Sequence, residues 1–200
     1  LLEVLVALPI LVLLLGMIYQ FLIPNFRLMS ESSIKAELQQ LAQLSTNQMI
    51  AELNSTPPTG VSIQIPASTA SPMIVATNPI FSADPTTGRP TYESKLVLFY
   101  NEPLNQSLFR KKTPQPPPSG VTFNSMAPLQ VPGPTLTALA TSTYPNTKKI
   151  AHHVESFLVQ KEPTTGGEVY RVELVLKQNL AGTDRIAEAN FVRKVFLRNH

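Results

Sequence analysis

Hydrophobic and polar residues are very unevenly distributed along this 200-residue chain. The segment from Leu1 to Phe26 is almost entirely apolar and contains a single charged side chain, that of Glu3. A helix that is apolar on every side is typical of burial in lipid or among other helices, and about 20 consecutive apolar residues are enough to span a bilayer. The pattern therefore predicts an apolar half-helix over residues 1–26 that lies in a membrane or in the core of an assembly.

The pattern changes after residue 26, where apolar residues recur at helical spacing among polar ones. The apolar positions are Ile34, Leu38, Leu41, Met49 and Leu53. This spacing predicts an amphipathic half-helix over residues 27–54 whose apolar stripe packs against a sheet. Pro57 and Pro58 cannot continue a helix, so we expect the whole helix to end near Asn54, after roughly 80 Å.

Three residues weaken the apolar half of this helix. Proline has no backbone N–H, so Pro9 and Pro24 leave the carbonyls of Leu5 and Gln20 without their helical hydrogen bonds. Gly16 is a poor helix former between them. We expect kinking or local unwinding from Gly16 to Pro24, above all when the helix packs in an assembly, and only a mild bend at Pro9.

The remaining residues, 55–200, predict a β-rich globular head. Residues 55–92 and 113–147 are rich in Pro, Ser and Thr, and predict long loops with short strands such as Met73–Thr77 rather than helices. Alternating or continuous apolar runs predict four further strands: Lys95–Tyr100, Val154–Val159, Glu168–Lys177 and Val192–Leu197. The expected connections between the last three strands are residues 163–167 and 179–190. The predicted fold class is α+β, a long N-terminal helix packed on an antiparallel sheet.

Composition argues against several classes of function. The chain has no cysteine, which excludes disulfides and thiolate metal sites. The net charge is +3, and its short basic clusters, such as Arg110-Lys111-Lys112, are explained by solvated strand ends, so nucleic-acid binding is not expected. The sequence contains no phosphate loop, nucleophile elbow or calcium loop. We therefore expect no enzymatic activity, no cofactor and no metal site, and interpret His152-His153 as the exposed start of a strand.

One modification motif stands at the end of the predicted helix. Asn54-Ser55-Thr56 satisfies the Asn-X-Ser/Thr pattern for N-glycosylation. Glu52 supplies an acidic residue two positions earlier, as bacterial oligosaccharyl transfer prefers. Because such triplets occur often by chance, Asn54 is a possible glycosylation site and unmodified asparagine is the simpler interpretation.

The opening Leu1-Leu2-Glu3-Val4-Leu5-Val6-Ala7-Leu8 resembles the N-terminus of type IV pilins and type II secretion pseudopilins. In that family a leader peptide ends in Gly and the mature chain starts Phe-Thr-Leu-X-Glu, so the match begins at the third mature residue. We expect residues upstream of Leu1 to have been removed or left out, and the apolar segment itself to be retained. The closing strands and the final Leu197-Arg198-Asn199 resemble larger minor pilins and J-type minor pseudopilins. Pro9 and the position of Pro24 depart from the family pattern.

The resemblance implies a subunit that waits in the inner membrane and then polymerises into a periplasmic or extracellular filament. Glu3 would pair with the N-terminal ammonium of a neighbouring subunit, and the apolar half-helices would pack as the filament core. The implied partners are copies of the chain, other pilins, a prepilin peptidase, and an inner-membrane platform with its ATPase. N-terminal methylation belongs to the same processing.

Two other interpretations stay open. The chain could serve as a minor pilin or pseudopilin that initiates or tips a filament for secretion or DNA uptake. A monomeric, membrane-anchored binding domain is the interpretation from a different class. The abundance of the chain in purified filaments separates the first of these from a major subunit.

Overall fold

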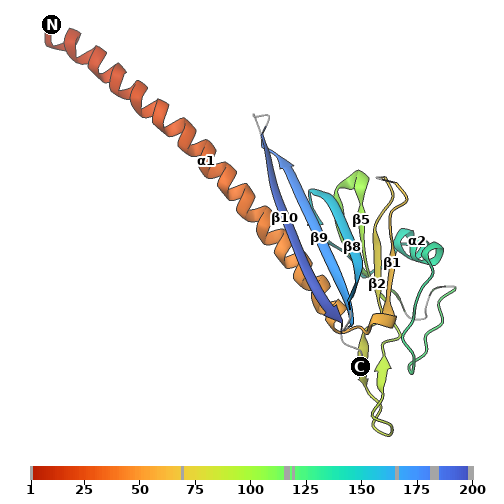
Figure 1. The fold of residues 1–200 in the computed structure, drawn as a ribbon. Coiled ribbons are helices and arrows are strands. Elements are labelled where there is room, and N and C mark those ends of the chain that lie inside the picture. The colour runs from red at the N-terminus through yellow and green to blue at the C-terminus, as the bar shows by residue number, and fades with distance from the viewer. Residues whose placement is uncertain are drawn as a thin grey trace.

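A computed structural model describes residues 2–68, 70–114, 118, 120–164, 167–180 and 185–197 of the chain. Its first element is α1 (Leu2–Asn54), a helix of 53 residues that projects far beyond the head (Figure 1). The single long helix ends where the two consecutive prolines were expected to stop it. A short 3₁₀ turn, η1 (Pro58–Gly60), then leads into the first strand.

The described residues of the head form three antiparallel sheets. The largest has the order β1-β2-β5-β6-β7, and a second has the order β10-β9-β8. The third is the two-stranded pair β3-β4, whose hairpin projects from the end of the head opposite the free end of α1 (Figure 1). The strands are β1 (Val61–Gln64), β2 (Ile74–Thr77), β3 (Ile80–Ala83), β4 (Pro90–Tyr92), β5 (Val97–Glu102), β6 (Ser107–Lys112), β7 (Thr147–His152), β8 (Val154–Thr164), β9 (Gly167–Asn179) and β10 (Ile186–Leu197).

The second half of α1 forms the main core together with the two larger sheets. The helix packs mainly against β10 and also contacts β9 and β7. Its buried apolar residues are Leu38, Ala42, Met49 and Leu53, with Ile34, Leu41 and Ile50 packed around them. From the β9 face predicted to be apolar, Tyr170, Val172, Leu174 and Leu176 are all buried. The α+β class, with a long helix packed on an antiparallel sheet, is therefore confirmed.

The five-stranded sheet is covered on both faces. Along β5, Val97 and Phe99 face the core shared with α1, whereas Leu98 and Tyr100 face a second core. That second core is closed by α2 (Gly133–Thr141) through Leu136 and Leu139. Because both faces are buried, the strand reads as a continuous apolar run.

The helix α2 corrects the expectation that residues 113–147 hold no helix. Pro134 lies in its first turn, where the missing N–H of proline costs nothing. The following residues Leu136, Ala138, Leu139 and Ala140 favour a helix. The Pro- and Thr-rich composition of the segment concealed this short apolar stretch.

The predicted connections between the last strands were too long. β10 begins at Ile186, which pairs with Asn179, so much of the expected loop 179–190 is strand. In this part of β10, Ala187 and Ala189 are buried. Their small side chains let α1 approach the sheet closely. In the other hairpin, Thr164 pairs with Gly167, so the expected loop 163–167 is mostly strand as well.

The chain passes from the five-stranded to the three-stranded sheet at His153. This residue has φ 58°, in the left-handed region, and separates β7 from β8. His152 is the exposed last residue of β7, and β8 begins at Val154. The histidine pair therefore lies at the end of one strand, not at the start of the next as expected. A second left-handed residue, Gln106, lies beside this corner, and its carbonyl accepts the N–H of Val154 at 2.8 Å.

Candidate functional site

The first half of α1 is the most distinctive surface of the molecule. From Pro9 to Phe26 every residue is exposed, including large apolar side chains on all sides of the helix. Tyr19 and Phe21 are 69% and 73% exposed. Figure 1 shows this half extending away from the head. The helix is long and apolar enough to cross a membrane. A surface of this kind is stable only against lipid or other apolar helices.

The backbone of this half is helical throughout. α1 runs without interruption through Pro9, Gly16 and Pro24, so the single chain shows no unwinding between Gly16 and Pro24. Gly16 has open space around it, and a Cβ there would meet nothing within 4 Å. The remaining ladder of helical hydrogen bonds holds the segment together despite the two missing donors. Unwinding of this segment in an assembled filament stays a prediction.

Glu3 belongs to the first turn of α1. The structure does not describe its side chain, so its assembly role stays a prediction from the sequence. Its position places a carboxylate close to the helix N-terminus, where the partial positive charge of the backbone favours a negative group.

A small charged cluster marks the point where the apolar half of α1 meets the head. Glu31 accepts a hydrogen bond from Lys35 at 2.8 Å and pairs at 3.3 Å with Arg185, the residue just before β10. The Lys35 hydrogen bond lowers the pKa of Glu31 below its ordinary value, so Glu31 is charged at neutral pH. A hollow of about 430 Å³ lies beside this cluster. Its lining residues are Pro24, Arg27, Leu28, Ser30, Glu31, Ile34, Leu180 and Arg185.

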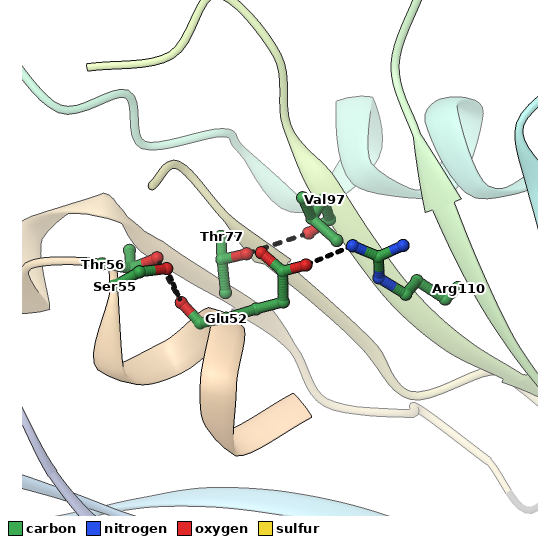
Figure 2. Close-up of polar contacts among 6 residues, drawn as sticks. All are labelled: Glu52, Ser55, Thr56, Thr77, Val97 and Arg110. Carbon is green, nitrogen blue, oxygen red and sulfur yellow. Dashed lines mark hydrogen bonds and ion pairs between the residues drawn. The ribbon is translucent and has the colours of Figure 1, made fainter. Parts of the chain in front are cut away.

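A second ion pair anchors the other end of α1. Glu52, in the last turn, accepts a hydrogen bond from the guanidinium of Arg110 on β6 (Figure 2). The carbonyl oxygen of Glu52 also accepts the hydroxyls of Ser55 and Thr56, at 2.8 and 2.7 Å. Glu52 therefore joins the helix end to the five-stranded sheet and also terminates the helix.

Asn54 is the last residue of α1 and is exposed. Thr56, the third residue of the glycosylation motif, is only 2% exposed, and its hydroxyl is engaged with the Glu52 carbonyl. The asparagine is thus accessible in the folded head while the threonine is not. Modification of Asn54 stays a prediction, and this geometry favours transfer before the head folds.

The basic cluster at 110–112 is largely engaged inside the protein. Arg110 pairs with Glu52, and Lys111 is 1% exposed. The Lys111 ammonium donates to the carbonyls of Leu139, Ala140 and Ser142 at the C-terminal end of α2, and it lies 4.7 Å from the ring centre of Tyr100. Burial lowers the pKa of Lys111. The cluster is therefore not a free basic patch, and Lys111 serves as a C-terminal cap, because cations favour the negative end of a helix.

The described residues contain no group of three or more His, Asp or Glu side chains that could hold a metal ion. His152 and His153 contact each other, with ring centres 4.7 Å apart. The carboxylates of Glu155 and Glu173 lie on the sheet and pair with Lys177 and Arg171, as solvated sheet residues do.

Comparisons of the chain with known protein families, with curated proteins and with solved structures find no match.

Sequence reasoning missed the two anchoring contacts made by Arg110 and Lys111. Both residues fall in a strand, β6, whose alternation is obscured by three consecutive basic residues. The partners of these residues are far away in sequence, so no local pattern signals them. Arg27 and Glu31 are the first charged residues after the apolar run, so the sequence does show where charge begins on the helix.

Proposed function

We propose that this chain is a structural subunit of a type IV pilus-like filament, and that it polymerises through the apolar half of α1. The observation that carries the proposal is the apolar surface of residues 9–26, which is exposed on all sides while the remainder of the helix is fixed to a folded head. The N-terminal pattern around Glu3 supports the same conclusion.

The energetics favour two environments for this surface. Burying one large apolar side chain is worth about 1.5–3 kcal/mol, so leaving the whole half-helix in water would cost tens of kcal/mol. Lipid supplies burial before assembly, and identical helices supply it afterwards. When the half-helix moves from lipid to a core of identical helices, most of its apolar surface stays buried. The subunit can therefore leave the membrane without exposing its helix to water.

The second half of α1 makes the helix and the head one mechanical unit. Its apolar stripe lies in the main core, and the Glu52–Arg110 pair fixes its last turn. A pull on the apolar half is therefore transmitted to the head through packed side chains. This coupling suits a subunit whose heads coat a filament and whose helices form its centre.

Glu3 is proposed as the residue that registers one subunit against the next. A carboxylate within an apolar helix is expensive and is retained for a specific partner. In the proposed filament that partner is the N-terminal ammonium of a neighbouring chain. A prepilin peptidase and an inner-membrane assembly platform with its ATPase are the further partners that the proposal requires. The chain itself would lie in the inner membrane before assembly and then in a periplasmic or extracellular filament.

The test is the yield and composition of purified filaments from cells whose only copy of the chain is wild type, Glu3→Ala or Glu37→Ala. Glu37 is the matched control, because it is an exposed carboxylate on the same helix. We expect normal membrane insertion in all three cases and a large loss of filament incorporation for Glu3→Ala alone. A high abundance of the chain along wild-type filaments identifies a major subunit, and a trace abundance identifies a minor one. Absence of the wild-type chain from every filament contradicts the proposal.

A further inference from the structure

The hollow beside the Glu31 cluster has an unusual distribution of charge. Glu31 is shared between Lys35, at 2.8 Å, and Arg185, at 3.3 Å. Arg27 lies one helical turn before Glu31, at the spacing that normally allows an ion pair. It is exposed and makes no hydrogen bond or ion pair with any other residue in the described part of the chain. The carboxylate is thus occupied by other cations, and Arg27 is left to an external anion.

The lining of the hollow is half apolar, and its polar residues are Arg27, Ser30, Glu31 and Arg185. Leu28, Ile34 and Leu180 line it together with Pro24, while Arg27 and Arg185 supply positive charge. Its volume of about 430 Å³ falls within the range of small-molecule sites, about 300–1,000 Å³. Apolar side chains next to cations are complementary to an amphiphile that carries a negative head.

The position along α1 fixes the depth of the hollow in a membrane. Arg27 is the first charged residue after the apolar run. The stretch from Pro9 to Phe26 spans about 27 Å as a helix, close to the hydrocarbon thickness of about 30 Å. When this stretch spans the bilayer, Arg27 and the hollow lie at the level of the lipid headgroups.

We propose that this hollow binds the headgroup phosphate of an anionic phospholipid, with Arg27 as its principal cation. The planar guanidinium donates two parallel hydrogen bonds to phosphate oxygens. The side chains of Leu28 and Pro24 then contact the upper part of the acyl chains. The site holds the head close to the membrane surface in a defined orientation. This inference rests on insertion of α1 in a membrane and is independent of filament assembly.

The test measures which lipids remain bound to the full chain. The protein is reconstituted in vesicles of phosphatidylcholine and phosphatidylglycerol, extracted in mild detergent, and analysed by native mass spectrometry. The variants are Arg27→Gln, Arg27→Lys and Lys148→Gln, the last being an exposed cation on β7 that controls for net charge. All these positions are exposed, and thermal unfolding of each variant verifies that the head is intact.

We expect wild type and Lys148→Gln to retain phosphatidylglycerol in preference to phosphatidylcholine. Arg27→Gln should lower this preference roughly fivefold, corresponding to about 1 kcal/mol for one cation at a membrane surface. Arg27→Lys should keep part of it, because lysine retains the charge but cannot donate the two parallel hydrogen bonds. An unchanged preference in Arg27→Gln overturns the proposal. Displacement of the lipid by inorganic phosphate alone, or a change in self-association without a change in lipid retention, also overturns it, since the hollow would then be a phosphate site or an interface between copies.

Discussion

Arg110 on β6 and Glu52 in the last turn of α1 form an ion pair that joins residues 58 positions apart in sequence. The two side chains are 25% and 19% exposed, so water screens the pair only in part. The contact fixes the end of the helix against the five-stranded sheet at the place where the chain enters the head. It complements the apolar packing of α1 on β10, which lies in the other sheet.

Replacing Glu52 with Gln should weaken this anchor without removing the packing around it. We expect a loss of about 1–2 kcal/mol in the free energy of unfolding, between the values for surface pairs and for buried ones. Urea unfolding of the full chain in detergent measures it. The control is Lys35→Ala, which breaks a more exposed pair and should cost under about 0.5 kcal/mol. Equal effects of the two variants would show that the Glu52 pair has no special role.

Lys111 should be one of the most sensitive positions in the head. Lys111→Met keeps the apolar stem but removes the ammonium from the carbonyls of Leu139, Ala140 and Ser142. Loss of charged hydrogen bonds and of a helix cap predicts a destabilisation of about 2–4 kcal/mol. Lys112→Met, one residue away and only partly buried, should change stability by no more than about 0.5 kcal/mol. A fully stable Lys111→Met protein would mean that water replaces the ammonium.

His153 should make stability depend on pH. Burial lowers the pKa of His153, as does the nearby charge of His152, while Glu37 on α1 opposes the shift. The unfolded chain therefore binds a proton more readily than the folded one, so stability falls as pH drops below about 6.5. His153→Asn should flatten this slope, and asparagine accepts the left-handed φ of 58°. Thermal unfolding between pH 7.5 and pH 5 is the measurement. A slope identical in wild type and variant contradicts the assignment.

Removal of the apolar half-helix should leave a folded, monomeric head. In a chain of residues 27–200 the main core is complete, because its helical contribution begins with Ile34 and Leu38. The helix surface that is apolar on all sides is gone. Sedimentation and an amide NMR spectrum test this outcome. Aggregation, or a spectrum without dispersion, would show that the head depends on residues 1–26.

The sequence predicted those elements whose pattern is local and strong. The apolar half-helix, the stripe from Ile34 to Leu53 and the alternation of β9 each repeat over several turns or residues, so the helix, its buried face and the α+β class followed from them. The stripe also includes Ala42, Ser45 and Thr46, which are buried although two of them are polar. Ser45 is satisfied by the Ile150 carbonyl at 2.8 Å, a partner that no local pattern reveals.

The elements that escaped prediction depend on distant partners. β6 carries Arg110-Lys111-Lys112, and the partners of Arg110 and Lys111 lie on α1 and α2. β7 carries two consecutive lysines that are both exposed. The helix α2 is hidden in a proline-rich segment, and its end is satisfied by Lys111. The Arg27 hollow requires Leu180 and Arg185, about 150 residues further along the chain, to come next to α1. The roles proposed for Glu3 and for the segment from Gly16 to Pro24 stay predictions, because they concern contacts with other chains.

Disulfide cross-linking through single cysteines on α1 tests the central claim most directly. The chain has no native cysteine, so each substitution reports one position. Leu13→Cys and Met17→Cys, both on the exposed apolar half, are compared with Leu104→Cys, which is 91% exposed on the head. After mild oxidation of assembled filaments, we expect dimers through residues 13 and 17 and none through residue 104. Monomers alone from the helix variants, in preparations that contain the chain, would contradict polymerisation through α1.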